Sequence, residues 1–342
     1  MVVLNYLIQL LFLSLAICFT PILATPTSSK NPAIGSPCKR IYVHKEWRDI
    51  KVKDRLSYIA AVKCLMKLPS STGGKDTSSR FEDFQATHID LTERVHLVGQ
   101  FLPWHRHLVN LYSKALRNEC GYKGPIPFWD WARDGDSKVP LSASPIFDPL
   151  TGFGGSGVPG TYTVPEDTST IPEPFRYVGC VQTGPFRQGV YTAHLGPGKL
   201  VTDHCLIRGV NETWKPMMRG REIEKQVAST DFETFRIVID DFTNGIHGIG
   251  HAGVGGEMTN FWSAPADPLF YLHHLNLDRM WWQWQQRDPA NRLYQISGPT
   301  TQGGLIQTTM DFIMDFPRLG RNVTVRDVMD LAKEPNCFTF AY

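Results

Sequence analysis

Two histidines lie two positions apart in the apolar stretch FLPWHRHLVNLYSKAL, residues 101–116. An imidazole can transfer a proton, pair with a carboxylate or bind a metal ion, so its placement decides its chemistry. If Pro103 lies near the start of a helix, an apolar stripe begins at Leu108, and His105, three residues earlier, faces inward with it. His107 shares its face with Asn110, Lys114 and Arg117, so we predict that His107 lies at the surface.

The chain contains 11 histidines, and several others follow helical spacings. His88, His96 and His105 are separated by eight and nine residues. His247 and His251 have the i, i+4 spacing that stacks two imidazoles on one helix face and suits a shared metal ion. The amphipathic stretch YLHHLNLDRMWWQW, residues 271–284, adds His273 and His274, which periodicity does not separate.

Two groups of inward-facing histidines are stronger evidence for a metal site than a single HxxxH pair. Facing helices of a bundle can build a metal site from side chains in the bundle core. Neutral imidazoles without cysteine or carboxylate ligands favour copper, with zinc next, and the zinc-protease motif HExxH is absent. Glycines at 245, 248, 250 and 253 surround His247 and His251, although each interior glycine costs a helix about 1 kcal/mol. They indicate close approach of another backbone or of a cofactor.

The elements that must position these histidines are predominantly helical. Apolar periodicity predicts helices at 53–68, 88–98, 104–118, 231–246 and 269–286. Residues 135–200 are rich in Gly, Pro, Ser and Thr and are expected to form ordered loop over the helices, pinned by disulfides. The sequence therefore predicts a mainly α fold, a helical bundle with long disulfide-pinned loops.

The N-terminus and the cysteines point to the secretory pathway. Residues 2–24 carry no charged side chain, which favours a signal peptide spanning 1–24 over the alternative, an uncleaved membrane anchor. A single domain is expected over 25–342. Beyond Cys18 the cysteines form an even set without CxxC, typical of disulfides. Sequons begin at Asn211 and Asn322, so we expect a secreted glycoprotein.

Composition limits the partners. A hydrophobic content of 42% and a net charge of +2 are typical of a folded soluble protein. They give no reason to expect nucleic acid or a stable membrane association. The oligomeric state stays open.

Several motifs then resemble one family, that of tyrosinases and catechol oxidases. They are FLPWHR (101–106), PFWDWARD (127–134), HGIGH (247–251), GGEM (255–258) and APADPLFYLHHLNLDRMWWQWQ (264–285). The resemblance runs from about Cys38 to Tyr342. It implies a helical bundle that holds two copper ions and uses O2 as co-substrate.

The same resemblance implies the ligands. His88, His96 and His105 would bind the first copper, and His247, His251 and His274 the second, since the second histidine of the HH pair is the ligand in the family. Asp278 matches the family's HHxxxD and is expected to orient an imidazole. A disulfide between Cys38 and Cys337 is also plausible, and the length leaves no room for the C-terminal domain that plugs the site in longer relatives.

Three departures from the family pattern bear on the substrate. Arg94 stands where many members have a cysteine linked to the second ligand, so that thioether is impossible here. Gly248 follows His247, where monophenol-hydroxylating members often have an asparagine. Phe261 aligns with the position that gates the second copper. Together they favour oxidation of o-diphenols to o-quinones over tyrosine hydroxylation, with o-aminophenols or monophenols as further candidate substrates.

Other functions remain open at this point. A hemocyanin-like oxygen carrier uses the same six-histidine centre, and a biosynthetic tailoring oxidase would act on one phenolic metabolite or on a peptide tyrosine. A metal-free binding module is a third alternative. We interpret the tryptophans at 129, 131, 281, 282 and 284 as core, and His194 and His204 as surface residues.

Overall fold

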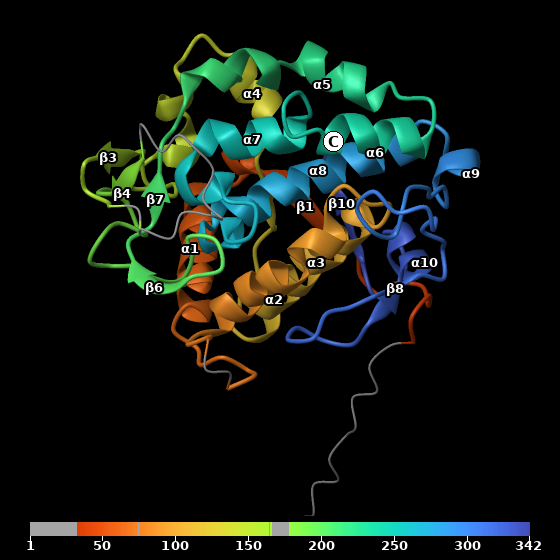
Figure 1. The fold of residues 1–342 in the computed structure, drawn as a ribbon, viewed down its shortest axis with the longest axis horizontal. Helices are drawn as coiled ribbons and strands as arrows, with labels where there is room; N and C mark the ends of the chain where they lie inside the picture. The colour runs from red at the N-terminus through yellow and green to blue at the C-terminus, as the bar shows by residue number, and fades with distance from the viewer. Residues whose placement is uncertain (1–32, 74–75, 164, 166–177) are drawn as a thin grey trace, which may run out of the picture. The chain divides into compact units, whose positions relative to one another are not determined.

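Helices cross the core of the computed structural model, which describes residues 33–73, 76–163, 165 and 178–342 (Figure 1). The predicted signal peptide, residues 1–24, lies outside the described residues. The main helices are α1 (Val52–Leu65), α2 (Arg80–Val95), α3 (Phe101–Asn118), α6 (Phe232–Asp240), α7 (Ile246–Val254) and α8 (Leu269–Gln286). Shorter helices are α4 (Trp131–Gly135), α5 (Gly220–Val227), α9 (Pro289–Arg292) and α10 (Val325–Met329). The mainly α prediction is confirmed.

Short strands join the ends of the described chain. β1 (Tyr42–Glu46) pairs in parallel with β10 (Phe338–Phe340) and β2 (Pro127–Phe128). The irregular middle holds β3 (Gly157–Pro159), β4 (Gly179–Val181), β5 (Ala193–Leu195), β6 (Val201–His204) and β7 (Ile207–Arg208), and β8 (Ile313–Met314) pairs with β9 (Val323–Thr324). None of the helices in the described ranges has both the length and the apolar character needed to cross a bilayer.

The helix starts follow from local sequence. Ser79 caps α2 by accepting from the Glu82 backbone N–H at 3.3 Å, and the Glu82 carboxylate accepts from the Ser79 N–H at 3.1 Å. This capping box begins α2 eight residues before His88, so the predicted start at 88 was too late. At the start of α8, Asp267 accepts from the Leu269 N–H at 2.9 Å.

The core is a contiguous apolar cluster in which α3 packs on α8, α2 packs on α3, and α7 packs on α8. The rings of Tyr112 on α3 and Tyr271 on α8 stack with centroids 3.6 Å apart. Trp129, Trp131, Trp281 and Trp284 are fully buried. Trp282 packs against the core from a partly buried position. The interpretation of these tryptophans as core is therefore confirmed.

Three disulfides tie the described loops and ends. Cys38 bonds to Cys337, as expected, next to the parallel pair β1 and β10. Cys64 and Cys120 connect the ends of α1 and α3, and Cys180 bonds to Cys205 within the irregular middle.

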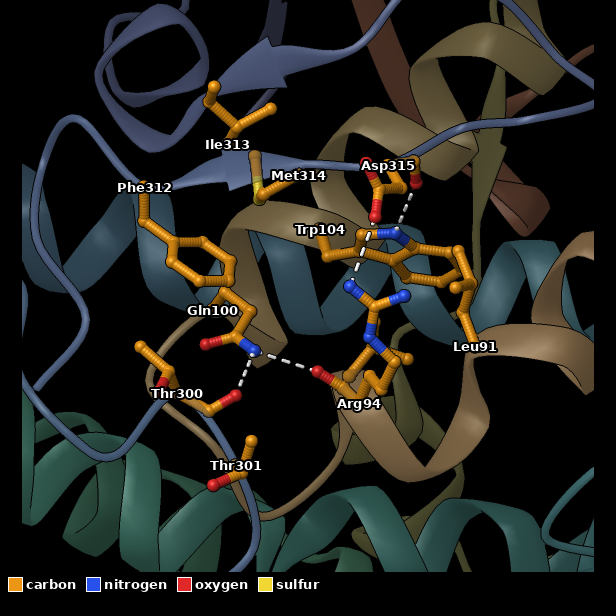
Figure 2. A pocket seen from close by; sticks show the side chains of 11 residues that line it. Leu91, Arg94, Gln100, Trp104, Thr300, Thr301, Phe312, Ile313, Met314 and Asp315 are labelled. Atoms are coloured by element: carbon orange, nitrogen blue, oxygen red, sulfur yellow. Dashed lines mark hydrogen bonds and ion pairs between the residues drawn. The ribbon is translucent and has the colours of Figure 1, made fainter. Parts of the chain in front are cut away.

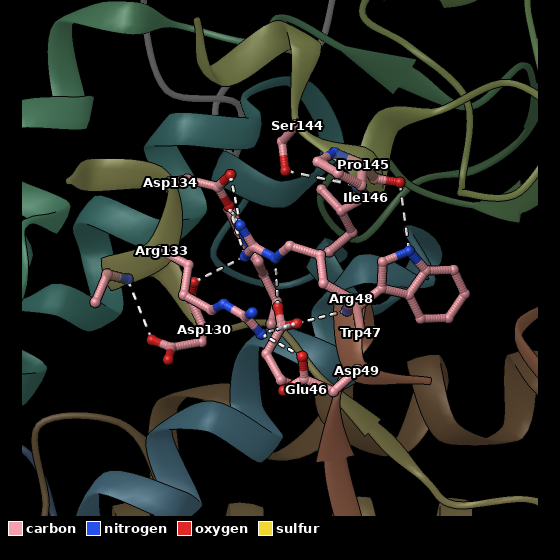
Figure 3. A network of polar contacts seen from close by, with 12 residues as sticks. Glu46, Trp47, Arg48, Asp49, Asp130, Arg133, Asp134, Ser144, Pro145 and Ile146 are labelled. Atoms are coloured by element: carbon pink, nitrogen blue, oxygen red, sulfur yellow. Dashed lines mark hydrogen bonds and ion pairs between the residues drawn. The ribbon is translucent and has the colours of Figure 1, made fainter. Parts of the chain in front are cut away.

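A polar network fixes the short helix α4 (Figure 3). The Arg48 guanidinium donates to the two Asp134 oxygens at 3.1 Å each. Arg133 donates to Glu46 at 2.9 Å, and Glu46 also accepts from Arg48 Nε at 2.9 Å. These ion pairs fix α4 against residues 46–48, and Trp131 at its start donates to His273 of α8 at 3.1 Å.

The prediction of one helix over residues 231–246 was wrong. The stretch 231–246 does not form one helix: α6 ends at Asp240, and the Asp241 carboxylate accepts from the N–H groups of Thr243 and Asn244 at 2.8 and 3.1 Å, which closes a turn. α7 then begins after Gly245. An aspartate that binds the backbone two and three residues ahead competes with helix continuation.

His107 is buried, with 3% exposed, so its predicted surface position was also wrong. The C-terminal part of the chain covers this face of α3. The Phe316 ring lies edge-on to His107 with centroids 4.7 Å apart, and Asn110 Nδ2 donates to the Pro335 carbonyl at 2.9 Å. Periodicity identified a polar face but could not show that distant residues cover it.

Candidate metal centre

His88, His96 and His105 form the first histidine cluster. His88 lies on α2, His96 caps its C-terminal end in an extended conformation, and His105 lies on α3. Their ring centroids are 4.8 to 5.7 Å apart, and all three side chains are buried. One nitrogen from each ring lies within 4.8 Å of the others.

Backbone carbonyls fix the tautomers of the first histidine cluster. The Nδ1 atoms of His88, His96 and His105 lie 2.8, 2.8 and 2.9 Å from the carbonyl oxygens of Trp262, Thr92 and Phe101, respectively. A carbonyl only accepts hydrogen bonds, so each Nδ1 carries the proton and each Nε2 keeps a lone pair. The Nε2 atoms of His88 and His105 are buried without a partner among the described residues.

His247, His251 and His274 form the second histidine cluster, with His273 beside them. His247 and His251 lie one turn apart on α7, with ring centroids 4.8 Å apart, and His274 lies on α8, 5.2 Å from His247 and 5.4 Å from His251. His247 Nδ1 donates to Asp240 Oδ1 at 2.9 Å, and its buried Nε2 has no partner among the described residues. Within the same described part of the chain, both ring nitrogens of His274 are likewise buried and unpaired.

The structure separates His273 from His274, which periodicity could not. The indole N–H of Trp131 lies 3.1 Å from His273 Nδ1. Because an indole nitrogen only donates, His273 Nδ1 carries the lone pair and the proton of the neutral ring is on Nε2. His274 has no such donor among the described residues, so both of its nitrogens remain open to a ligand.

The two clusters face each other across the bundle core. The rings of His105 and His274 stack with centroids 4.4 Å apart, and those of His96 and His247 are parallel at 5.7 Å. Phe270 lies between the clusters, 4.1 Å from His274 and 5.2 Å from His88. Side chains from α2, α3, α7 and α8 together create this arrangement.

Burial favours the neutral form of five clustered imidazoles, those of His88, His96, His105, His251 and His274. It lowers the pKa of His96 to about 4, against the opposing charge of Asp240, and lowers the pKa of His88, His105, His251 and His274 well below the ordinary value. Neighbouring imidazoles add to this effect. Neutral rings with buried, unpaired nitrogens are the form in which histidine binds a metal, so the donor set fits two metal ions.

The Asp278 carboxylate is buried but contacts arginine rather than histidine. Arg106 Nε donates to Asp278 Oδ1, and its Nη1 donates to the Val328 and Met329 carbonyls at 3.1 and 3.0 Å. Asp278 Oδ2 and His274 Nδ1 both lack a hydrogen-bond partner among the described residues. These hydrogen bonds connect α3, α8 and α10. Asp278 was predicted to orient an imidazole, but the structure shows no hydrogen bond between Asp278 and a histidine among the described residues.

Gly248 and Gly250 allow close approach of neighbouring groups. A Cβ at Gly248 would lie 2.5 Å from the Phe242 carbonyl oxygen, and one at Gly250 would lie 2.2 Å from the His273 ring. The groups that closely approach these glycines are thus the Phe242 backbone and the His273 ring of the protein itself. The partly buried ring of Phe261 lies 5.0 Å from His96 and 5.7 Å from Phe242.

Arg94 lines a cavity of about 150 Å³ together with Asp315 and Gln100 (Figure 2). Its guanidinium pairs with Asp315 at 3.0 Å, and Trp104 Nε1 donates to the Asp315 carbonyl at 3.1 Å. Gln100 donates to the carbonyls of Arg94 and Thr300 at 2.7 and 2.9 Å. The residues lining this cavity include none of the clustered histidines.

His204 is buried at 8% exposure, which corrects its interpretation as a surface residue. Its Nε2 lies 3.3 Å from the buried Glu257 carboxylate and its Nδ1 lies 2.7 Å from the Thr202 carbonyl. Burial lowers the pKa of His204, but the hydrogen bond to Glu257 and its charge outweigh this and raise the pKa above the ordinary value. His194 is more exposed and pairs with Asp203.

Comparison with known proteins places this site in a family. The model described as the common central domain of tyrosinase matches residues 78–287, which include both clusters. The chain belongs to the tyrosinase family. Members of the tyrosinase family are oxidoreductases with a pair of copper ions, and the two histidine clusters are compatible with that centre.

Individual members of the tyrosinase family resemble most of the chain. Tyrosinase-like protein phomQ1 of Diaporthe leptostromiformis is 35% identical over 92% of this chain and 80% of its own length. N-acetyl-6-hydroxytryptophan oxidase ivoB of Emericella nidulans is 31% identical over 87% of this chain and 92% of its own. The structure of a mutant polyphenol oxidase from Thermothelomyces thermophila superposes with a TM-score of 0.76 at 27% identity, over 88% of this chain and 89% of that one.

Sequence reasoning missed Asp240, Phe270 and Trp131 as parts of the centre. Asp240 lies seven residues before His247, a spacing that carries no helical signal because a turn separates α6 from α7. Phe270 lies four residues before His274 on α8, so the i, i+4 rule could have placed its ring against that imidazole.

Proposed function

We propose that this chain is a secreted dicopper oxidase that uses O2 to oxidise o-diphenols to o-quinones. His88, His96 and His105 would hold one copper ion, and His247, His251 and His274 the other. The observation that carries the proposal is the pair of facing imidazole clusters whose buried nitrogens lack partners among the described residues. Six imidazole nitrogen donors without thiolate or carboxylate suit copper.

The bound copper pair would supply the redox chemistry, accepting electrons from the phenol and passing them to O2. Each o-diphenol releases two electrons and two protons, so two molecules of substrate reduce one O2 to two molecules of water. The chain's own residues would hold the metal pair and limit the access of water to it, because five of the six imidazoles are buried and that of His251 is partly buried.

The partly exposed residues indicate where substrate approaches. His251 and Gly248 on α7 are only partly buried, whereas the other five clustered histidines are buried. Phe261 and the exposed Phe242 lie beside them, with Phe242 6.3 Å from the His247 ring. These aromatic faces would hold a phenolic ring by stacking against its edge or face.

The residues around Gly248 favour o-diphenols and o-aminophenols over monophenols. Both of those substrates need only lose two electrons and two protons, whereas a monophenol must also gain an oxygen atom. Gly248 offers no side chain that could help remove the phenol proton, and the Phe242 backbone fills the space next to it. Monophenol hydroxylation is therefore proposed to be slow.

Secretion of the protein is supported by its disulfides. The three disulfides of the described residues are typical of proteins that fold in an oxidising compartment. The sequons at Asn211 and Asn322 would be glycosylated on that route. We propose no stable membrane association and no nucleic-acid partner.

A second candidate function is a tailoring oxidase of a biosynthetic pathway. The relative named N-acetyl-6-hydroxytryptophan oxidase is 31% identical to this chain and carries a single defined substrate in its name. The same centre would then act on one phenolic metabolite or on a peptide tyrosine.

Oxygen uptake on matched substrates tests the proposal. Protein reconstituted with copper should retain about two ions per chain and consume O2 with catechol and o-aminophenol, with a long lag or no turnover on the matched monophenol. Reversible O2 binding without quinone formation would instead indicate an oxygen carrier. Failure to retain a metal pair would refute the ligand assignment.

A further inference from the structure

Asp240 contacts both histidine clusters through its two carboxylate oxygens. Oδ1 accepts from His247 Nδ1 at 2.9 Å, and Oδ2 accepts from the backbone N–H of Leu97 at 2.6 Å. Leu97 directly follows His96, a member of the first cluster. Asp240 is the last residue of α6 and is 3% exposed, so both hydrogen bonds are shielded from water.

The backbone at Leu97 adopts a conformation that leucine rarely takes. Its φ is 59°, in the left-handed region, although the residue is not glycine. A non-glycine residue in this region persists only when its surroundings hold it there. The hydrogen bond from the Leu97 N–H to a buried carboxylate is such a constraint, and it fixes the turn that presents His96.

We infer that Asp240 is a positioning residue that holds His247 of one cluster and the His96–Leu97 turn of the other at a fixed separation. This inference rests on the proposed function. A carboxylate accepts and never donates when ionised, so it requires the proton of His247 on Nδ1 and leaves Nε2 free for a metal. One side chain thereby sets the tautomer at the second cluster and the backbone geometry at the first.

The other Nδ1 contacts cannot do this. The first-cluster rings donate to main-chain carbonyls, and each of these carbonyls accepts from the ring of one histidine and from no ring of the other cluster. Asp278 contacts Arg106 and no imidazole within the described part of the chain. Among the hydrogen bonds of the described residues, Asp240 thus joins an imidazole of the second cluster to the turn that presents His96 of the first.

Asp240→Asn tests the inference with little change in shape. An amide accepts on one side and donates on the other, so it cannot accept from both Leu97 N–H and His247 Nδ1–H. We expect copper affinity, measured by competition with a chelator, to fall about 10–100-fold. Asp203→Asn is the control, because that carboxylate also contacts a histidine Nδ1, that of His194 at 2.6 Å, but lies outside the clusters.

A readout without copper separates positioning from general damage. In metal-free wild-type protein, ¹⁵N NMR of histidine should show the His247 proton on Nδ1, and Asp240→Asn should shift it toward Nε2. Adding Leu97→Gly to Asp240→Asn should relieve the backbone strain and restore thermal stability, but not copper affinity. If the single variant does not fold, the wild-type spectrum and the double variant decide the matter.

Two results would overturn the inference: a wild-type His247 proton on Nε2, or unchanged copper affinity in Asp240→Asn. Wild-type protein that holds no copper pair would instead refute the proposed function, while the NMR result would still report on the hydrogen bond. The two failures are therefore distinguishable.

Discussion

The two histidine clusters are oriented by different means. In the first cluster each ring donates to a main-chain carbonyl, of Trp262, Thr92 or Phe101. In the second, His247 donates to the Asp240 side chain, and the Nδ1 atoms of His251 and His274 have no partner among the described residues. A ring held by the main chain tolerates changes of neighbouring side chains, whereas a ring held by a side chain does not. The second cluster should therefore be the more sensitive to substitution.

His251→Ala gives the largest expected effect. It removes one nitrogen donor from the second cluster, so copper bound there and catechol oxidation should both be lost, by more than the roughly 100-fold typical of changing a residue that only supports a ligand. Metal analysis and oxygen uptake measure the two losses. About one copper per chain should remain, held by the first cluster. Retention of full activity would contradict the assignment of His251.

Gly248→Ala tests whether the second cluster depends on the turn at 241–245. The new methyl group would meet the Phe242 carbonyl oxygen at 2.5 Å, and a backbone atom cannot move aside cheaply. We expect a loss of about 1–3 kcal/mol in the free energy of unfolding, measured by urea denaturation.

Gly320→Ala is the control for Gly248→Ala, because its added Cβ meets only a Leu111 methyl at 3.7 Å. It should be close to neutral. Equal stability of the two variants would show that the turn yields to the added methyl group.

His44, which belongs to neither cluster, should contribute to the loss of folding stability at acid pH. Burial, and then the charge of Arg117, lower the pKa of His44 to about 3. The unfolded chain therefore binds this proton first as the pH falls below about 6.5, and the folded state loses stability down to about pH 3, by at most about 1.4 kcal/mol per pH unit. His44→Phe should reduce that slope in metal-free protein and keep the stack on Phe338. An unchanged slope would contradict the neutral state of buried His44.

Trp262→Phe gives the smallest expected effect. It tests whether the first cluster is oriented by the main chain alone. The His88 ring binds the Trp262 carbonyl, which the substitution keeps. The hydrogen bond to Glu93 is lost, and the ring contacts with Lys199 and Phe261 become smaller. Stability should therefore change by less than about 0.5 kcal/mol, and copper affinity should stay as in the wild type. A marked fall in copper affinity would mean that side chains also orient the first cluster.

Periodicity and spacing correctly predicted the side-chain orientations that depend on one helix alone. The apolar stripe placed His105 inward on α3, the i, i+4 pair put His247 and His251 on one face of α7, and the structure shows both. The break between α6 and α7 was missed because Asp241 closes the turn through its own side chain, a local competition that apolar periodicity does not register.

Contacts between distant segments could not be predicted. His107 is covered by Phe316, and Asp240 reaches Leu97, which is 143 residues away in the sequence. No pattern within one helix reports such a partner. Periodicity left the choice between His273 and His274 open, and the family resemblance chose His274. The contact that distinguishes the two rings comes from the Trp131 indole, which α4 brings to the site from another part of the chain.

The bond between Cys38 and Cys337 gives the described chain the connectivity of a closed ring. The first cluster lies entirely before residue 106 and the second entirely after residue 246, so one peptide cleavage between them would put the two clusters on different fragments. Those fragments would still migrate as one species on a gel until a reducing agent is added. A protease could thus nick this protein without releasing either half of its metal centre.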